Sequence, residues 1–151
     1  RAGRVLAHGD TASMLARLDL PLTEGDAATT ILTATVTAHD AATHLSTLAF
    51  DGGVLHLINA QPPALGSQRR LRIQARDVSL SLQPPQHSSI LNSLPATVQS
   101  VRADSPGYAM VALRTGSATL LARISQHSAQ QLNIQAQQPV FIQVKSVALL
   151  D

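Results

Sequence analysis

The sequence contains no cysteine and no tryptophan, and its only aromatic residues are Phe50, Tyr108 and Phe141. Without cysteine there are no disulfide bonds and no thiolate metal sites, which is compatible with a reducing compartment. So few rings cannot form the stacking platform with which barrel domains hold single-stranded nucleic acid. Since 44% of the residues are hydrophobic, a core of Val, Leu, Ile and Ala is expected.

Charge is also scarce, because only 13% of the residues are charged and the formal net charge is +2. That is not the basic field of a nucleic-acid-binding protein, so no nucleic-acid partner is expected. No apolar window reaches the ~18 residues that a membrane-spanning helix needs, and we expect no signal peptide before the first predicted strand. Because the sequence opens "RAGRV" without a methionine, it is interpreted as part of a longer protein.

The sequence also lacks the common signatures of catalysis. It contains no G-x-x-x-x-G-K-[ST] motif to hold ATP phosphates, and no Ser-His-Asp or paired-carboxylate arrangement is suggested. The segment "HDAATH" brings His39, Asp40 and His44 together, but their spacing fits neither a helix face nor a standard zinc motif. The sequence therefore predicts neither an enzyme active site nor a metal site in this stretch.

Alternation of apolar and polar residues dominates the chain from residue 31 onward. Short alternating segments separated by Gly, Pro and Asp predict an all-β fold. One helical turn is predicted at 125–132, with Ser125 as its N-cap. Nearer the N-terminus, 3–8 reads as a strand and 10–18 as a helix. The predicted strands cover 31–39, 45–50, 54–58, 71–82, 93–101, 108–115, 118–124 and 140–150.

An internal repeat divides the chain. "RIQARDVSL" (72–80) aligns with "FIQVKSVAL" (141–149), and "LTATV" aligns with "LPATV" further upstream. Pro84 and Pro85 forbid a continuing strand between the two copies. About five short strands per copy suit a barrel of the oligonucleotide/oligosaccharide-binding (OB) type. The predicted organisation is therefore an N-terminal segment and two tandem β modules, with boundaries at 1–25, 26–83 and 84–151.

Lys145 is the only lysine among the 11 Lys and Arg residues, and it lies inside a predicted strand, followed at once by Ser146. Two interpretations are open. The side chain can be a strand-end charge that reaches water along its own stem. Alternatively, its charge is compensated by a bound anion, since an unpaired ammonium group in a buried strand is costly.

The second module resembles the molybdate-binding Mop module. The segments "SSILNSLPATV" and "ARISQHSAQQLNIQAQQPVFIQVKSVALLD" are similar to the family's Thr-Ser-Ala-Arg-Asn-like opening, its Ile-Thr-x-x-Ser segment and its closing Ile-Lys-x-Ser-Val strand. Two tandem copies form a di-Mop (Mop/TOBE) unit of two small OB-like barrels. "GRVLAHGDTASMLARLDLPL" resembles the end of the ATPase domain in the ATP-binding subunit of the molybdate importer, where a tandem Mop tail follows.

This resemblance implies a set of oxyanion ligands, since a tetrahedral dianion needs hydroxyl and N–H donors and some positive charge. In the family the oxyanion lies in a shallow pocket between modules, often contributed by two chains. Leu91 stands where the family has an arginine, so one cationic ligand is missing. The first module has Arg76 and Asp77 in place of Lys-Ser, with a possible hydroxyl from Thr30, and is expected to be degenerate. The ligands implied are Ser89, Asn92, Ser125, Ser128, Lys145 and Ser146.

The resemblance also implies a biological role. The chain would be a cytoplasmic regulatory domain, at the inner face of the membrane, that binds molybdate or tungstate and requires no metal cation. Its partners would be a second copy in a homodimer, the ATPase domain of the same chain and, through it, the membrane permease subunits. Two alternatives remain open: a structural dimerisation module whose pocket has decayed, and a free molybdate-storage protein.

Overall fold

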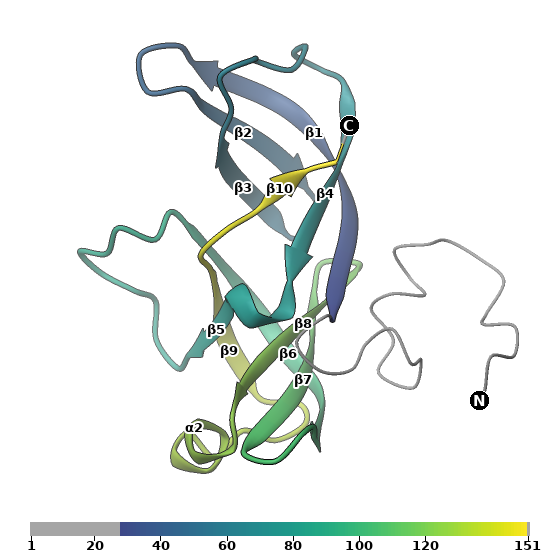
Figure 1. The fold of residues 1–151 in the computed structure, drawn as a ribbon, viewed down its shortest axis with the longest axis vertical. Coiled ribbons are helices and arrows are strands. Elements are labelled where there is room, and N and C mark those ends of the chain that lie inside the picture. The colour runs from purple at the N-terminus through teal and green to yellow at the C-terminus, as the bar shows by residue number, and fades with distance from the viewer. Residues whose placement is uncertain (1–27, 151) are drawn as a thin grey trace, which may run out of the picture.

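A computed structural model describes residues 28–150, which form two curled five-stranded antiparallel sheets with one short α-helix (Figure 1). The strand order is β10-β4-β1-β2-β3 in the first sheet and β5-β9-β6-β7-β8 in the second. The prediction of an all-β fold built from two small OB-like units is therefore confirmed. The strands are β1 (Thr29–Asp40), β2 (Leu45–Phe50), β3 (Gly53–Ile58), β4 (Gln68–Gln74), β5 (Val78–Ser81), β6 (Asn92–Ala103), β7 (Tyr108–Thr115), β8 (Ala118–Ser125), β9 (Pro139–Val144) and β10 (Ala148–Leu149).

The two sheets exchange their last strands. After β4 the chain turns through a 3-10 helix, Ala75–Asp77 (η3), and β5 then pairs with β9 of the second sheet. After β9 the chain crosses back, so that β10 pairs with β4 of the first sheet. The predicted strands 71–82 and 140–150 were thus wrong in their continuity, because each is two strands in different sheets. The module boundary at 83/84 stays a prediction. β5 precedes it but pairs with β9, and β10 follows it but pairs with β4.

The internal repeat is visible in the two longest strands. β1 and β6 each contain 12 residues. The pairing of β1 with β2 shifts register between Val36 and Ala38, and that of β6 with β7 shifts between Val98 and Ser100. These are equivalent places in the aligned "LTATV" and "LPATV" segments. A shift of this kind bends a strand and lets it curl around a core.

One large hydrophobic cluster contains side chains from both sheets. Fully buried side chains from the first sheet, such as Leu48 and Leu71, belong to the same cluster as Leu113 and Ile142 of the second. Each such side chain contributes roughly 1.5–3 kcal/mol when removed from water. The two halves are therefore held together by shared burial as well as by the exchanged strands.

The β2–β3 and β7–β8 turns pack against each other. The predicted hairpin turn at 51–53 is confirmed, and the backbone N–H of Ser117 donates to Asp51 Oδ2 at 3.0 Å. Gly116 has a φ of 61°, and a Cβ there would lie 2.6 Å from the backbone nitrogen of Gly52. Only glycine fits this close approach of two backbones.

The predicted helix is confirmed as α2 (Gln126–Gln131), with Ser125 as its N-cap. The strand and helix predicted at 3–8 and 10–18, like the whole N-terminal segment 1–25, lie outside the described residues. Within 28–150, no helix is both long enough and apolar enough to span a bilayer.

Candidate functional site

A pocket of about 380 Å³ lies where the chain crosses from β9 to β10, beside the edge of β3. It brings together residues that are far apart in the sequence, from the segments before β6, after β9 and along β3. Five of the residues singled out by the resemblance line it, including Leu91, which replaces the family's arginine. The lining residues are His56, Leu57, Ile58, Ser89, Ile90, Leu91, Asn92, Lys145, Ser146 and Val147.

Lys145 is exposed and lies outside any strand, because β9 ends at Val144. The prediction that it sits within a buried strand was therefore wrong. Its backbone N–H donates to the carbonyl of Asp77 at 2.9 Å, which fixes the crossover. Among residues 28–150, its ammonium group makes no hydrogen bond or ion pair. Hydration stabilises this charge without a ligand, and the amine remains available to the pocket.

Asn92 is 4% exposed and its carboxamide is largely engaged. Its Oδ1 accepts a hydrogen bond from the backbone N–H of His56 at 2.6 Å, and its Nδ2 donates to the carbonyl of His56 at 2.9 Å. A carboxamide has two N–H donors, so one of them remains for a ligand. Asn92 thus holds the edge of β3 against the start of β6 and forms one wall of the pocket.

A short turn positions the segment before β6. The backbone N–H of Ile90 donates to Ser88 Oγ at 3.0 Å. This places exposed Ser89 and the 56%-exposed Leu91 along the pocket. The hydroxyl of Ser89 can serve as a donor, whereas Leu91 offers only an apolar rim.

Ser125 and Ser128 do not line this pocket. They lie at the start of α2, toward the far end of the second sheet from the β9–β10 crossover (Figure 1). Ser125 Oγ accepts from the backbone N–H of Ser128 at 2.9 Å and donates to Ser128 Oγ at 2.9 Å. Within one chain, the four predicted serines therefore do not converge on one small sphere.

The two residues predicted in the first module lie elsewhere too. Thr30 is buried, and its Oγ1 accepts from the backbone N–H of Leu121 at 3.2 Å. Arg76 lies in η3, which packs against β8. Neither residue lines the pocket of Lys145.

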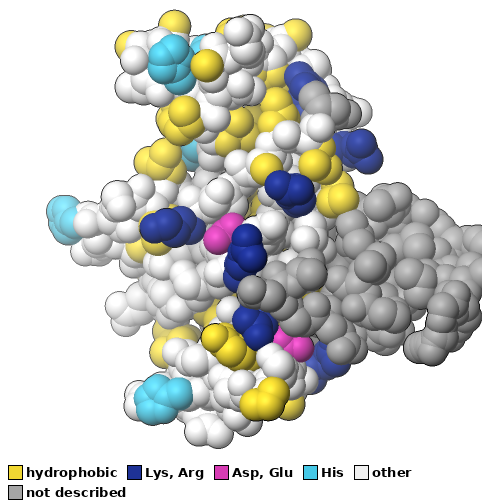
Figure 2. All heavy atoms as spheres, in the orientation of Figure 1, with side chains coloured by type: hydrophobic (Ala, Val, Ile, Leu, Met, Phe, Trp, Pro, Cys, Tyr) yellow, Lys and Arg dark blue, Asp and Glu magenta, His cyan; other side chains and the backbone are white. Residues whose placement is uncertain are grey.

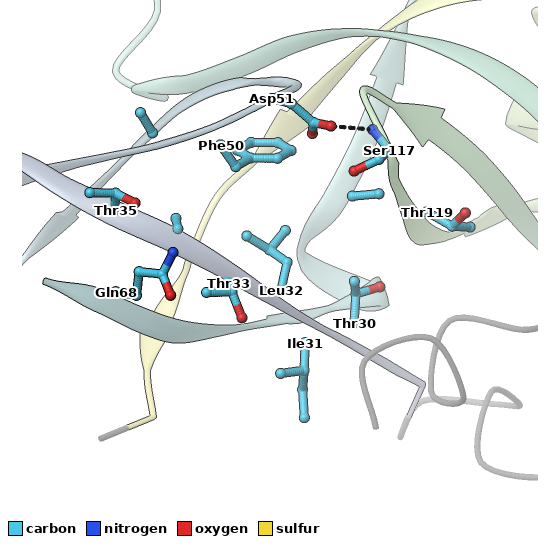
Figure 3. A pocket seen from close by; sticks show the side chains of 13 residues that line it. Thr30, Ile31, Leu32, Thr33, Thr35, Phe50, Asp51, Gln68, Ser117 and Thr119 are labelled. Carbon is cyan, nitrogen blue, oxygen red and sulfur yellow. Dashed lines mark hydrogen bonds between the residues drawn. The ribbon is translucent and has the colours of Figure 1, made fainter. Parts of the chain in front are cut away.

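A second pocket, of about 440 Å³, opens beside β1 and the β7–β8 turn (Figure 3). None of the described residues that line it carries a positive charge. Hydrogen bonds from Ser117 lower the pKa of the Asp51 carboxyl, which therefore stays negatively charged further into acid. A dianion would be repelled there. The polar lining residues are Thr30, Thr33, Thr35, Asp51, Gln68, Ser117 and Thr119.

The described part of the chain shows neither a cluster of metal-ligating side chains nor, on the face drawn in Figure 2, a continuous basic patch. Residues 28–150 contain no group of three or more His, Cys, Asp or Glu side chains that could hold a metal ion. His39 instead bonds to Ser46 through Nδ1 at 2.8 Å, and Asp40 accepts from the backbone N–H of Ala42. Figure 2 shows Lys and Arg side chains scattered over one face of the molecule, without a continuous basic patch.

Sequence reasoning missed His56 as a pocket residue. It lies on β3, half-buried, in the other half of the chain from Lys145. No motif marks it, because its place depends on the pairing of its backbone with Asn92 across the two sheets.

Comparison with known proteins gives three results. Residues 88–150 match the family model of the TOBE domain. The chain is 47% identical over 149 residues to "Molybdenum import ATP-binding protein ModC" of Albidiferax ferrireducens, covering 99% of this chain and 40% of that protein. It is 45% identical over 150 residues to the protein of the same description from Hahella chejuensis, covering 99% and 42%. The chain thus spans about two fifths of the length of these curated relatives.

The fold is also similar to a crystal structure of the cytoplasmic molybdate-binding protein ModG, in a form with molybdate bound. The TM-score is 0.69 at 19% sequence identity, and the match covers 79% of this chain and 93% of that one. At this identity the likeness concerns the fold, which agrees with the tandem barrel-like architecture described above.

Proposed function

Since residues 88–150 belong to the TOBE domain family, we propose that the chain is an oxyanion sensor that binds molybdate or tungstate. The binding site is the pocket of Lys145. The chain would serve as the regulatory region of an importer's ATP-binding subunit. The observation that carries the proposal is the convergence of Lys145, Ser146 and Ser89 on one pocket from two separate segments.

The chemistry of the pocket supports a tetrahedral dianion as ligand. The ammonium group of Lys145 offers charge and three N–H donors, while Ser89 and Ser146 offer hydroxyls and Asn92 one N–H. Charge-assisted hydrogen bonds to an anion contribute roughly 1.5–3 kcal/mol each. No metal cation is required, because every contact would be made to the oxygens of the ligand.

We further propose that the sensor works as a homodimer. Ser125 and Ser128 lie away from Lys145 within one chain, so a second copy would have to supply them to the pocket. Leu91 and the 66%-exposed Ile58 form an apolar rim at the pocket, and burying them against a second copy would remove both from water.

The proposed mechanism is feedback. Binding of the oxyanion favours one arrangement of the two copies, and that arrangement opposes ATP-driven closure of the attached ATPase domains. Coupling of this kind is reciprocal and typically amounts to about 1–3 kcal/mol. The protein would act in the cytoplasm, at the inner face of the membrane, with the permease subunits as partners of the ATPase domain. The relatives described as ATP-binding proteins for molybdenum import support this assignment.

Isothermal titration calorimetry with molybdate tests the binding step. A saturable heat together with a thermal shift is expected, since a ligand at 100 times its Kd stabilises the folded state by about 2.7 kcal/mol. Neither heat nor shift would favour the alternative of a structural dimerisation module, for which the leucine at position 91 is the supporting observation.

The feedback step needs the full-length protein in its transporter. There, molybdate is expected to lower the ATPase rate of the unsubstituted protein and to have less effect on the Lys145→Ala variant. The storage-protein alternative makes a different prediction, because the coding sequence upstream would then contain no P-loop. Reading that sequence distinguishes the two.

A further inference from the structure

His56 is held in the pocket wall by contacts to both its backbone and its ring. Its backbone N–H and carbonyl are both bonded to the Asn92 carboxamide. Its ring Nδ1 lies 3.0 Å from Thr47 Oγ1 on the neighbouring strand. Among residues 28–150, ring Nε2 makes no hydrogen bond. The ring is thus oriented through one nitrogen, and the other has no partner among the described residues.

The charge of the ligand exceeds the charge that Lys145 alone can compensate. A molybdate or tungstate ion carries two negative charges, whereas Lys145 supplies one positive charge. Of the described residues that line the pocket, only Lys145 and His56 carry or can gain a positive charge. The position at which the resemblance implies an arginine holds Leu91, so the second charge has to come from another element.

We propose that His56 is the second cationic ligand of the oxyanion pocket and takes the place of the missing arginine. This inference rests on the proposed function. With the dianion bound, the imidazole is in its protonated form, and any proton that it lacks beforehand comes from solvent. Its Nε2–H then donates to an oxygen of the ligand, while Nδ1–H donates to the hydroxyl of Thr47.

The surroundings of His56 couple its protonation to ligand binding. Thr47 on β2 and Asn92 on β6 face it, and neither titrates in the neutral range. Lys145 is the only charged side chain among the described residues that line the pocket. A bound dianion would attract a positive charge on the imidazole. Histidine is the side chain that gains charge most readily between pH 5 and 8, so oxyanion affinity should increase as the pH falls through that range.

Calorimetry of molybdate binding in two buffers of different ionisation enthalpy measures the proton uptake directly. The unsubstituted protein is expected to take up a fraction of one proton near pH 7 and to bind about tenfold more tightly at pH 6 than at pH 8, a difference of about 1.4 kcal/mol. In the His56→Gln variant both effects should vanish. Any protonation of molybdate itself is common to both proteins and cancels in the comparison.

His39→Gln is the matched control. His39 is also half-buried in the first sheet and also bonds to a hydroxyl through Nδ1, but it does not line the pocket. This variant should keep the proton uptake and the pH dependence. The same readout is available without substitution, because the imidazole NMR signals of His56 should shift on addition of molybdate while those of His39 stay in place.

The outcomes separate the two proposals. If the unsubstituted protein binds molybdate, but with a pH dependence that His56→Gln retains or with unchanged His56 signals, the role of His56 is overturned and the sensor stands. If the unsubstituted protein does not bind molybdate at any pH, the sensor itself is overturned, and His56 with it.

Discussion

The carboxamide of Asn92 makes both of the backbone hydrogen bonds that a neighbouring strand would make to His56, at 2.6 and 2.9 Å. Asn92 begins β6 of the second sheet, whereas His56 lies on β3, at the edge of the first. Thr30 makes a related contact in the opposite direction, from β1 of the first sheet to Leu121 on the edge strand β8. Each sheet thus covers part of the other's open edge, where unpaired backbone groups would otherwise invite association.

Asn92→Ala should destabilise the fold by about 1–3 kcal/mol, because it leaves a backbone N–H and a carbonyl without partners. Thr30→Val is the comparison and should cost about 1 kcal/mol, since it removes one acceptor. Urea denaturation measures both values. A larger loss for Thr30→Val than for Asn92→Ala would contradict this account of the two edges.

Lys145→Ala should weaken molybdate binding by roughly 1.5–3 kcal/mol, the contribution of one charge-assisted hydrogen bond. The free energy of unfolding without ligand should stay nearly unchanged, because the side chain is exposed. Arg114→Ala removes an exposed positive charge from β7, outside the pocket, and should leave the affinity unaltered. Calorimetry on the unsubstituted protein and the two variants measures the affinities. Equal affinities in all three would show that Lys145 is not a ligand.

Gly116→Ala should destabilise the protein more than Gly107→Ala. Both glycines have positive φ angles, 61° and 88°, so an alanine at either position costs about 1–2 kcal/mol of backbone strain. Only at Gly116 does the new methyl group also meet the opposite turn, whereas nothing lies within 4 Å at Gly107. Thermal unfolding of the two variants should show this order, and equal shifts in Tm would mean that the turns separate without cost.

The contact between Asp51 and Ser117 should weaken in acid. The pKa of the Asp51 carboxyl lies below its ordinary value of 3.8 because Ser117 donates hydrogen bonds to it. A carboxyl with a lowered folded-state pKa contributes stability that is complete above its unfolded pKa, and this contribution is lost as the pH falls through the folded value. Asp51→Asn should therefore flatten the acid side of the stability profile, measured by urea denaturation below pH 4. A variant with the same acid slope as the parent protein would show that Asp51 has no part in it.

If the chain is divided between residues 83 and 84, neither half should fold on its own. Fragment 1–83 carries β5, which completes the second sheet, and fragment 84–151 carries β10, which pairs with the first. Neither fragment should unfold cooperatively by circular dichroism, while an equimolar mixture should recover the transition. A cooperative transition in either fragment alone would show that its sheet does not need the borrowed strand.

Most of the strands could be predicted, because apolar–polar alternation reports a one-sided sheet and glycine and proline mark its turns. The repeat correctly related "RIQARDVSL" to "FIQVKSVAL". The repeat could not reveal that β5 and β10 each pair with the sheet of the other half. Both strands are short, and their apolar–polar alternation would be the same in either sheet. Lys145 and Ser146 stood out by residue type and resemblance. His56 did not, since its place depends on contacts between the two sheets.

The exchange has a mechanical consequence. The crossover that carries Lys145 and Ser146 leads directly from a strand of one sheet into a strand of the other. A ligand held at this crossover would contact the segment that joins the two sheets. The two halves could then separate only if β5 and β10 first detached from the sheets in which they pair.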